Sequence, residues 1–167
     1  MNFHLKIEDG MLRRVRADLE RPHRLAAERI GFLRMGLADA GEAILLLAAE
    51  YRPVADGHYR RDPMAGASIG ADAIREALEW ADGWHGGVFH VHAHFGRGVP
   101  VFSPLDVRNN ARLIPSFFNI APDKVHGAVL LSDDCVTGAV WPAKNARPIP
   151  VTRATVIRAP MRSWWLR

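Results

Sequence analysis

Four residues with metal-binding or catalytic side chains lie in one short segment of the chain, which reads HAHFGRGVPVFSPLD. His92 and His94 are separated by one residue, and Ser103 lies three residues before Asp106. Alternate side chains of a β-strand leave the same face, so in a strand the two imidazoles would point the same way, about 7 Å apart along the backbone. Asp106 could join them from the first turn of a helix. Three protein ligands would leave the fourth tetrahedral position for water, as a catalytic zinc site requires.

A hydrolytic zinc site also needs a group that takes a proton from the attacking water and passes it to the leaving group. Glu28 is our candidate for this base, because Gly31 would let another segment approach the backbone closely at the start of a strand. Glu42 and Glu50 remain alternatives, since each flanks the second predicted strand of a hairpin. Ser103 could donate its hydroxyl hydrogen to the developing oxyanion, and donors of this kind contribute a factor of about a hundred or more.

Apolar periodicity predicts the elements that would position these residues. Residues 87–94 form a predicted strand in which His90, His92 and His94 share one face. Ser103 as N-cap, Pro104 at the first helical position and Asp106 form a helix start signal, and this helix is expected to run to about residue 113. The other predicted strands are 3–7, 30–35, 42–50, 126–131, 136–141 and 151–157, the other predicted helices are 11–21 and 69–81, and 51–67 is predicted to be mostly loop.

This order of elements predicts an α/β protein with one domain, residues 1–167, built on a mixed β-sheet flanked by helices. The hydrophobic fraction of 49% and the charged fraction of 24% are ordinary for a globular protein. The single cysteine, Cys135, excludes an internal disulfide and any cysteine-based zinc cluster. No apolar run approaches the roughly 20 residues that span a membrane, so we expect a cytoplasmic protein with no membrane partner.

The net charge of +4 raises the question of a nucleic-acid partner. The arginines are scattered along the chain, however, and the aromatic residues do not alternate with them as stacking platforms would. We therefore expect no nucleic-acid partner. The basic surface would favour an acidic protein partner.

The candidate residues follow the order and spacing of a known family. The pattern is Glu28-x-x-Gly31, then His92-x-His94, eight residues, and Ser103-x-x-Asp106. It resembles the JAMM (MPN-plus, Mov34/JAB-type) zinc metalloproteases, and the resemblance is strongest over residues 26–141. It implies the JAB/MPN architecture, which is similar to that of cytidine deaminases.

The resemblance also implies a role for each of these residues. One zinc ion would be held by His92, His94 and Asp106, Glu28 would activate the attacking water, and Ser103 would support the oxyanion. Members of the family cleave isopeptide or peptide bonds after ubiquitin or ubiquitin-like proteins, and some prokaryotic relatives process sulfur-carrier proteins of the same fold. A ubiquitin-like protein or its conjugates would therefore be the partner and substrate.

Three features depart from the usual pattern of this family. Ala93 stands where serine or threonine is usual, Phe95 replaces a proline, and the gap before Ser103 is eight residues where seven is usual. One extra loop residue changes the entropy of loop closure little. These departures indicate a divergent prokaryotic-type member. Because all five chemical positions are filled, an active enzyme is favoured over the alternative, a catalytically inactive MPN-type scaffold or protein-binding module.

Other residues and motifs offer rival interpretations, which the sequence favours less. His90 and His92 form a rival ligand pair, but that choice breaks the spacing, so we expect His90 to orient a ligand or to pack. A nucleotide deaminase is disfavoured because the Pro-Cys-x-x-Cys ligand motif is absent, as is the HExxH motif of helical zinc proteases. The Trp164–Trp165 pair is expected to pack rather than to anchor a partner.

Overall fold

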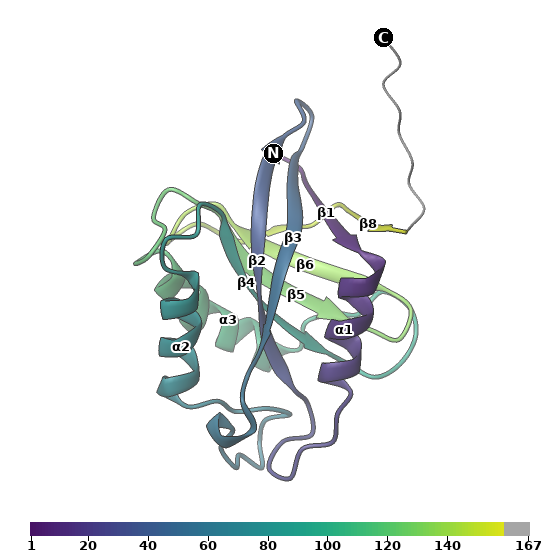
Figure 1. Ribbon diagram of the computed structural model, residues 1–167, viewed down its shortest axis with the longest axis vertical. Coiled ribbons are helices and arrows are strands. Elements are labelled where there is room, and N and C mark those ends of the chain that lie inside the picture. The colour runs from purple at the N-terminus through teal and green to yellow at the C-terminus, as the bar shows by residue number, and fades with distance from the viewer. Residues whose placement is uncertain (159–167) are drawn as a thin grey trace.

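The computed structural model describes residues 1–158, which form one eight-stranded mixed β-sheet and three α-helices (Figure 1). The Trp164–Trp165 pair lies outside the described residues. The elements are β1 (Phe3–Glu8), α1 (Asp9–Leu19), β2 (Ile30–Asp39), β3 (Ile44–Pro53), the 3-10 helix η1 (Asp56–His58), α2 (Ala71–Ala81), β4 (Gly87–Ala93), α3 (Pro104–Phe117), β5 (His126–Leu131), β6 (Val136–Trp141), β7 (Ile149–Pro150) and β8 (Arg153–Ile157).

The strands follow the order β7-β6-β5-β4-β2-β3-β1-β8 across the sheet. Parallel pairing joins β1 to β3 and β8, and β4 to β5, whereas the remaining pairs are antiparallel. The last segment pairs with both edges, because β7 extends β6 and β8 extends β1. Between them, the Val151 N–H donates to Gly138 O and the Thr152 N–H donates to Phe3 O, both at 2.9 Å. The sheet therefore curls, and the predicted α/β class with a mixed sheet is confirmed.

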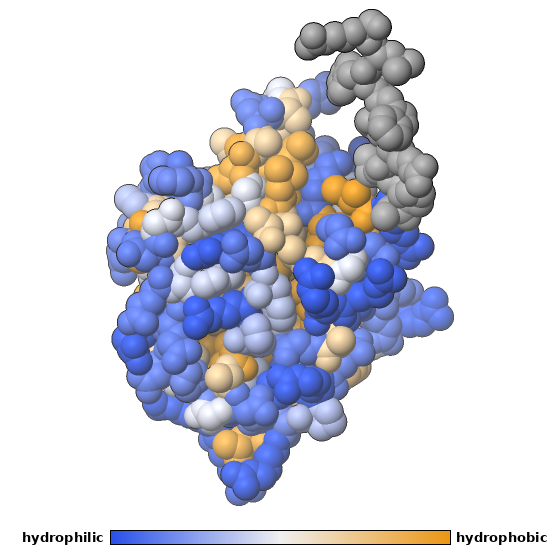
Figure 2. Space-filling view, in the orientation of Figure 1, coloured by the Kyte–Doolittle hydropathy of each residue, from blue (hydrophilic) through white to orange (hydrophobic). Residues whose placement is uncertain are grey.

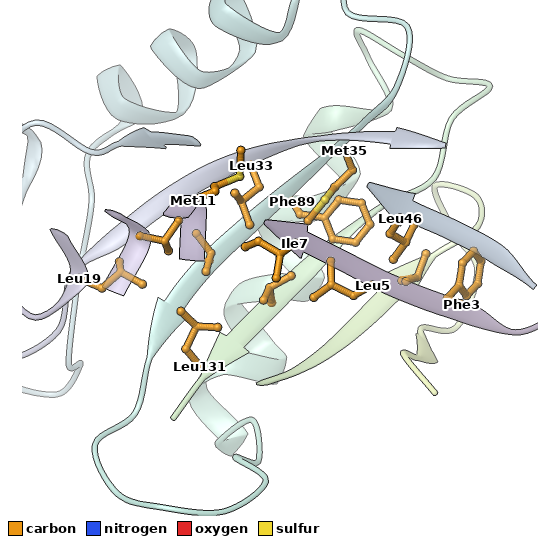
Figure 3. Packing of buried hydrophobic residues seen from close by; sticks show 14 residues of the cluster. Phe3, Leu5, Ile7, Met11, Leu19, Leu33, Met35, Leu46, Phe89 and Leu131 are labelled. Atoms are coloured by element: carbon orange, nitrogen blue, oxygen red, sulfur yellow. The ribbon is translucent and has the colours of Figure 1, made fainter. Parts of the chain in front are cut away.

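Each face of the sheet packs against helices through its own apolar cluster. Phe89 and Val91 of β4 belong to the cluster that contains α1, part of which is shown in Figure 3. Val88 of β4 belongs to the other cluster, which contains α2 and α3. This alternation follows from the two-residue period of a strand. It directs His90 and His92, which share the side of Val88, toward α2 and α3, and their predicted placement on one face of the strand is confirmed.

The β2–β3 hairpin is longer than predicted. Both strands have ten residues, and Tyr51–Pro53 belong to β3 instead of the predicted loop. Tyr51 is kept in the strand by two contacts: its hydroxyl donates to Asp18 Oδ2 at 2.6 Å, and its ring lies where a Cβ of Gly31 would be. Gly31 thus permits a close approach, as expected. The apolar residues on the face seen in Figure 2 gather over this hairpin.

Helix α3 also extends beyond its predicted end at residue 113. It continues to Phe117 even though Pro115 lies inside it. Proline removes one backbone donor from a helix, which favours an end before it. Here Ile114 and Phe117 are completely buried against the sheet, and the apolar area that they remove from water outweighs the lost hydrogen bond.

The described residues include no helix that has both the length and the apolar character needed to cross a bilayer.

His126, at the start of β5, is a buried histidine with both ring nitrogens occupied. Its Nδ1 accepts from the Val88 N–H at 3.1 Å, and its Nε2 lies 2.9 Å from Ala121 O. Burial lowers the pKa of His126 in spite of these contacts. As the pH falls, His126 therefore takes up a proton in the unfolded chain at a higher pH than in the folded protein.

Acid is accordingly expected to destabilise the fold through His126. Above pH 6.5 the residue is neutral in both states and contributes no pH dependence. As the pH falls below about 6.5, the free energy of unfolding should decrease by at most about 1.4 kcal/mol per pH unit from this group. Urea denaturation at pH 7.5, 6.5 and 5.5 measures the decrease. His126→Gln, which keeps a donor and an acceptor, should show a shallower pH dependence, and an equal slope in both proteins would contradict this origin.

Candidate metal centre

The strand pairing brings Glu28 to the two histidines. β2 and β4 are antiparallel neighbours, and Ile30 at the start of β2 is paired with His92 near the end of β4. Glu28 therefore precedes β2 at the same end of the sheet. His94 follows β4 directly, and its N–H donates to Leu131 O of β5 at 2.9 Å, which holds it in line with the strand.

The predicted metal ligands converge at this end of the sheet. Asp106 Oδ1 lies 3.2 Å from His92 Nε2, and Asp106 Oδ2 lies 3.3 Å from His94 Nε2. Glu28 Oε1 lies 4.0 Å from His94 Nε2. Glu28, His92 and His94 form a group that could hold a metal ion, because one ligand atom from each lies within 4.8 Å of the others. Asp106 contacts both imidazoles of this group from α3.

The state of His92 supports metal binding at this position. The side chain is 3% exposed, and neither ring nitrogen has a hydrogen-bond partner among the described residues. Its Nε2 is near Asp106 without hydrogen-bond geometry. Buried polar atoms in folded proteins are nearly always paired, because an unpaired one loses its hydration without compensation. A metal ion between His92 and the carboxylates would supply the missing partner for Nε2.

Asp106 is oriented by the start of α3. Its Oδ2 accepts from the Ser103 N–H at 2.7 Å, while Ser103 Oγ accepts from the Asp106 N–H at 3.1 Å, which is a capping box. Burial would raise the pKa of Asp106, but contacts with His92 and Ser103 outweigh it and hold the pKa well below its usual value. Asp106 is therefore ionised, as a metal ligand must be. The predicted helix start is confirmed.

Glu28 is held by a segment that the sequence did not associate with the site. The N–H groups of Ala27 and Glu28 both donate to Gly66 O, at 2.8 and 3.0 Å. A Cβ on Gly66 would lie 2.6 Å from Cδ of Glu28, so the carboxylate packs directly on the glycine. The only signal for this contact in the sequence was the glycine itself, in a region predicted to be loop.

Alanine at position 66 is therefore expected to displace the Glu28 carboxylate. If Glu28 is the catalytic base expected from the sequence, Gly66→Ala should lower the rate of peptide- or isopeptide-bond cleavage by roughly 10- to 100-fold. Small displacements of a catalytic group have effects of this size. The measurement is the cleavage rate together with the zinc content. Gly57→Ala is the matched control, since a Cβ there meets no atom within 4 Å. Equal rates in the two variants would contradict the packing role of Gly66.

A cleft of about 530 Å³ opens beside these residues, between residues 62–69 and α3. Glu28, His92 and Asp106 lie in its wall, whereas Ser103 and His94 are not among the described residues that line it. His90 also lines the cleft and is buried. Burial and the nearby His92 lower the pKa of His90 to about 3, so this imidazole is neutral at physiological pH.

The competing candidates do not belong to the group of metal-binding side chains. His90 does not belong to the group that could hold a metal ion. Glu42 lies in the turn of the β2–β3 hairpin, and Glu50 pairs with Arg34 at 3.0 Å. Of the glutamates considered, Glu28 alone joins the histidines in the described part of the chain.

The loop between His94 and Ser103 is held by the turn that joins β5 to β6. Ser132 Oγ donates to Gly98 O at 2.6 Å, and the Gly98 N–H donates to Asp134 Oδ1 at 2.7 Å. These contacts hold the eight residues between His94 and Ser103 against the turn that joins β5 to β6. Phe95 is 69% exposed in this loop.

No model of a known protein family matches this chain, and no curated protein matches it.

Proposed function

We propose that this protein is a zinc-dependent isopeptidase or peptidase of the JAMM type, with JAB/MPN architecture. It would cleave the bond that follows the C-terminal tail of a ubiquitin-like protein, in deconjugation or in precursor processing. The observation that carries this proposal is the convergence of two imidazoles and two carboxylates, from Glu28, His92, His94 and Asp106, at one end of the sheet.

His92, His94 and Asp106 would hold the zinc. Two nitrogens and one carboxylate are ligands that zinc accepts, and three protein ligands are typical of a catalytic rather than a structural site. When bound, zinc supplies a Lewis acid that polarises the scissile carbonyl and lowers the pKa of water.

Glu28 would take the proton from the attacking water and deliver it to the departing amine. It lies next to His94, and its side chain is 26% exposed, so solvent and substrate can reach the carboxylate. Its backbone is fixed to Gly66, which limits the movement of the carboxylate away from the ligands. A base positioned in this way contributes about 100- to 10,000-fold to a proton-transfer step.

Ser103 would stabilise the oxyanion. Its Oγ accepts the Asp106 N–H, which leaves the hydroxyl hydrogen free to donate to the substrate. The same capping box ties this hydroxyl to Asp106. The start of α3 thus holds the proposed zinc ligand Asp106 and the proposed oxyanion donor Ser103 next to each other.

The cleft provides room for an extended substrate tail. Its volume of about 530 Å³ lies in the range of ligand sites, and Glu28 and Asp106 lie in its wall. A ubiquitin-like protein would remain outside the cleft while its tail enters it.

Zinc content and cleavage measured on the same preparation test this function. The protein should hold one zinc per chain and cleave a fusion in which a ubiquitin-like protein precedes a reporter. Removal of zinc with a chelator should abolish cleavage, and added zinc should restore it. A protein-binding scaffold should hold no stoichiometric zinc. Stoichiometric zinc without cleavage of ubiquitin or sulfur-carrier fusions would contradict the proposed substrate.

A further inference from the structure

The cleft beside the metal-binding residues ends in a floor that nothing above assigns to metal binding or catalysis. Four residues that line the cleft are buried, namely Ile30, His90, Asn110 and the predicted metal ligand His92, and the first three form this floor. The apolar side chains of Ile69, Ile74, Leu105 and Leu113 line it further. Apolar walls with a few converging polar groups are typical of a ligand site.

His90 has a polar atom with no partner in this floor. Its Nδ1 is buried and makes no hydrogen bond among the described residues. The ring of His90 lies beside that of His92, with the centroids 5.1 Å apart. Its polar contact on α3 is with the side chain of Asn110. His126 shows the ordinary arrangement, because both of its buried nitrogens are occupied by backbone groups.

The difference between these two histidines points to a ligand. A buried nitrogen that is unpaired lowers the stability of the fold, and native structures contain few such atoms. His126 avoids this penalty within the fold, whereas His90 lies in the wall of an open cleft. A group that enters the cleft could therefore occupy the free hydrogen-bonding capacity of His90.

The chemistry of the floor selects among possible groups. Outside the metal centre, the charged residues that line the cleft are the half-buried Asp62 and the exposed Arg112. A charged group at the buried His90 and Asn110 side chains would therefore lose its hydration away from these charges. An apolar group would leave the nitrogen of His90 and the amide of Asn110 without new partners. An uncharged group with a donor and an acceptor satisfies both side chains. Amides and hydroxyls are such groups.

We propose that His90 and Asn110 form a specificity subsite that binds an uncharged amide or hydroxyl group of a substrate side chain close to the bond that is cut. The assignment of the ligand as a substrate side chain rests on the proposed function. His90 and Asn110 would then determine which sequences bind well, whereas Glu28 and the metal ligands act at the scissile bond.

Binding of short peptides tests this subsite without relying on cleavage. The probes are fluorescently labelled hexapeptides of alanine in which one position at a time carries glutamine, leucine or glutamate. Fluorescence anisotropy measures their dissociation constants for the zinc-loaded Glu28→Gln protein and for metal-free wild type. At one position, glutamine should bind roughly 5- to 10-fold more tightly than leucine or glutamate, which is the size expected for a hydrogen bond between uncharged groups.

Two variants separate binding from a structural role. His90→Phe keeps a ring in the floor and removes the nitrogens, and Asn110→Leu removes the amide. Each should abolish the preference for glutamine over leucine. His90→Phe should stay folded because it keeps a ring in the floor, and thermal unfolding checks this. His126→Gln is the control: it changes a buried histidine outside the cleft and should keep the preference.

Three results would overturn the subsite: an unchanged glutamine preference in folded His90→Phe, a preference for leucine or glutamate in wild type, or no binding of any peptide. Cleavage of the ubiquitin-like fusion is measured separately. A glutamine preference without cleavage would refute the proposed function and leave the subsite in place. Cleavage without a glutamine preference would refute the subsite alone.

Discussion

Glu28→Gln is expected to lower the rate of cleavage by roughly 100- to 10,000-fold, the contribution typical of a general base, and to leave zinc bound. Glutamine has nearly the shape of glutamate and keeps the packing on Gly66, but it cannot accept the proton of the attacking water. Single-turnover cleavage of the fusion and the zinc content of the same sample measure the two effects.

Glu42→Gln is the matched control for this substitution. Glu42 is exposed in the hairpin turn, outside the group that could hold a metal ion, so its variant should cleave at the wild-type rate. Unchanged cleavage in Glu28→Gln would remove Glu28 from the mechanism.

The same pair of measurements distinguishes two possible ligand sets. Glu28 itself belongs to the group with His92 and His94, so it could bind the metal in place of Asp106. In that arrangement, Glu28→Gln would lose zinc and Asp106→Asn would retain it. We expect the reverse, because Asp106 lies closer to both imidazoles, at 3.2 and 3.3 Å, than Glu28 lies to His94, at 4.0 Å.

His92→Leu is expected to weaken zinc binding by more than roughly 100-fold, since even the loss of an outer partner of a ligand weakens binding by about 10- to 100-fold. The metal-free variant should be close in stability to the metal-free wild type. Leucine fills a similar volume and removes two buried nitrogens that have no hydrogen-bond partner among the described residues, but it also removes the contact with Asp106.

Zinc titration against a competing chelator measures the affinity, and thermal unfolding with and without zinc measures the stability. Zinc at about 100 times the wild-type dissociation constant should stabilise the wild type by about 2.7 kcal/mol and His92→Leu by less than about 0.4 kcal/mol. His126→Gln is the control, because it alters a buried histidine outside the group that could hold a metal ion and should bind zinc normally. Wild-type affinity in His92→Leu would contradict its role as a ligand.

Local patterns in the sequence were sufficient for much of the fold. The alternation of residues in β4 determined which face of the strand carries His90 and His92. The capping box was readable from Ser103, Pro104 and Asp106, because a helix start depends on residues that are adjacent in the chain. Helix α2 was recognisable by its apolar period, and it ends at Ala81 as predicted, shortly before Gly83, whose φ is 71°.

Element ends depended on contacts between distant residues. Tyr51 stays in β3 because it packs on Gly31 and bonds to Asp18, and α3 passes Pro115 because Ile114 and Phe117 are buried. Neither contact is encoded by a local pattern, so the shorter hairpin and the shorter helix were reasonable but wrong.

The types and spacing of Glu28, His92, His94, Ser103 and Asp106 were evident in the chain itself, and so was the chemistry they could perform. Only the tertiary structure decided that they meet, since this requires β2 and β4 to be neighbours in one register. It also brought Gly66 under Glu28 and left the Nδ1 of His90, in the wall of a cleft, without a hydrogen-bond partner among residues 1–158. A sequence pattern reports periodicity along one element, whereas a site is formed by packing between several.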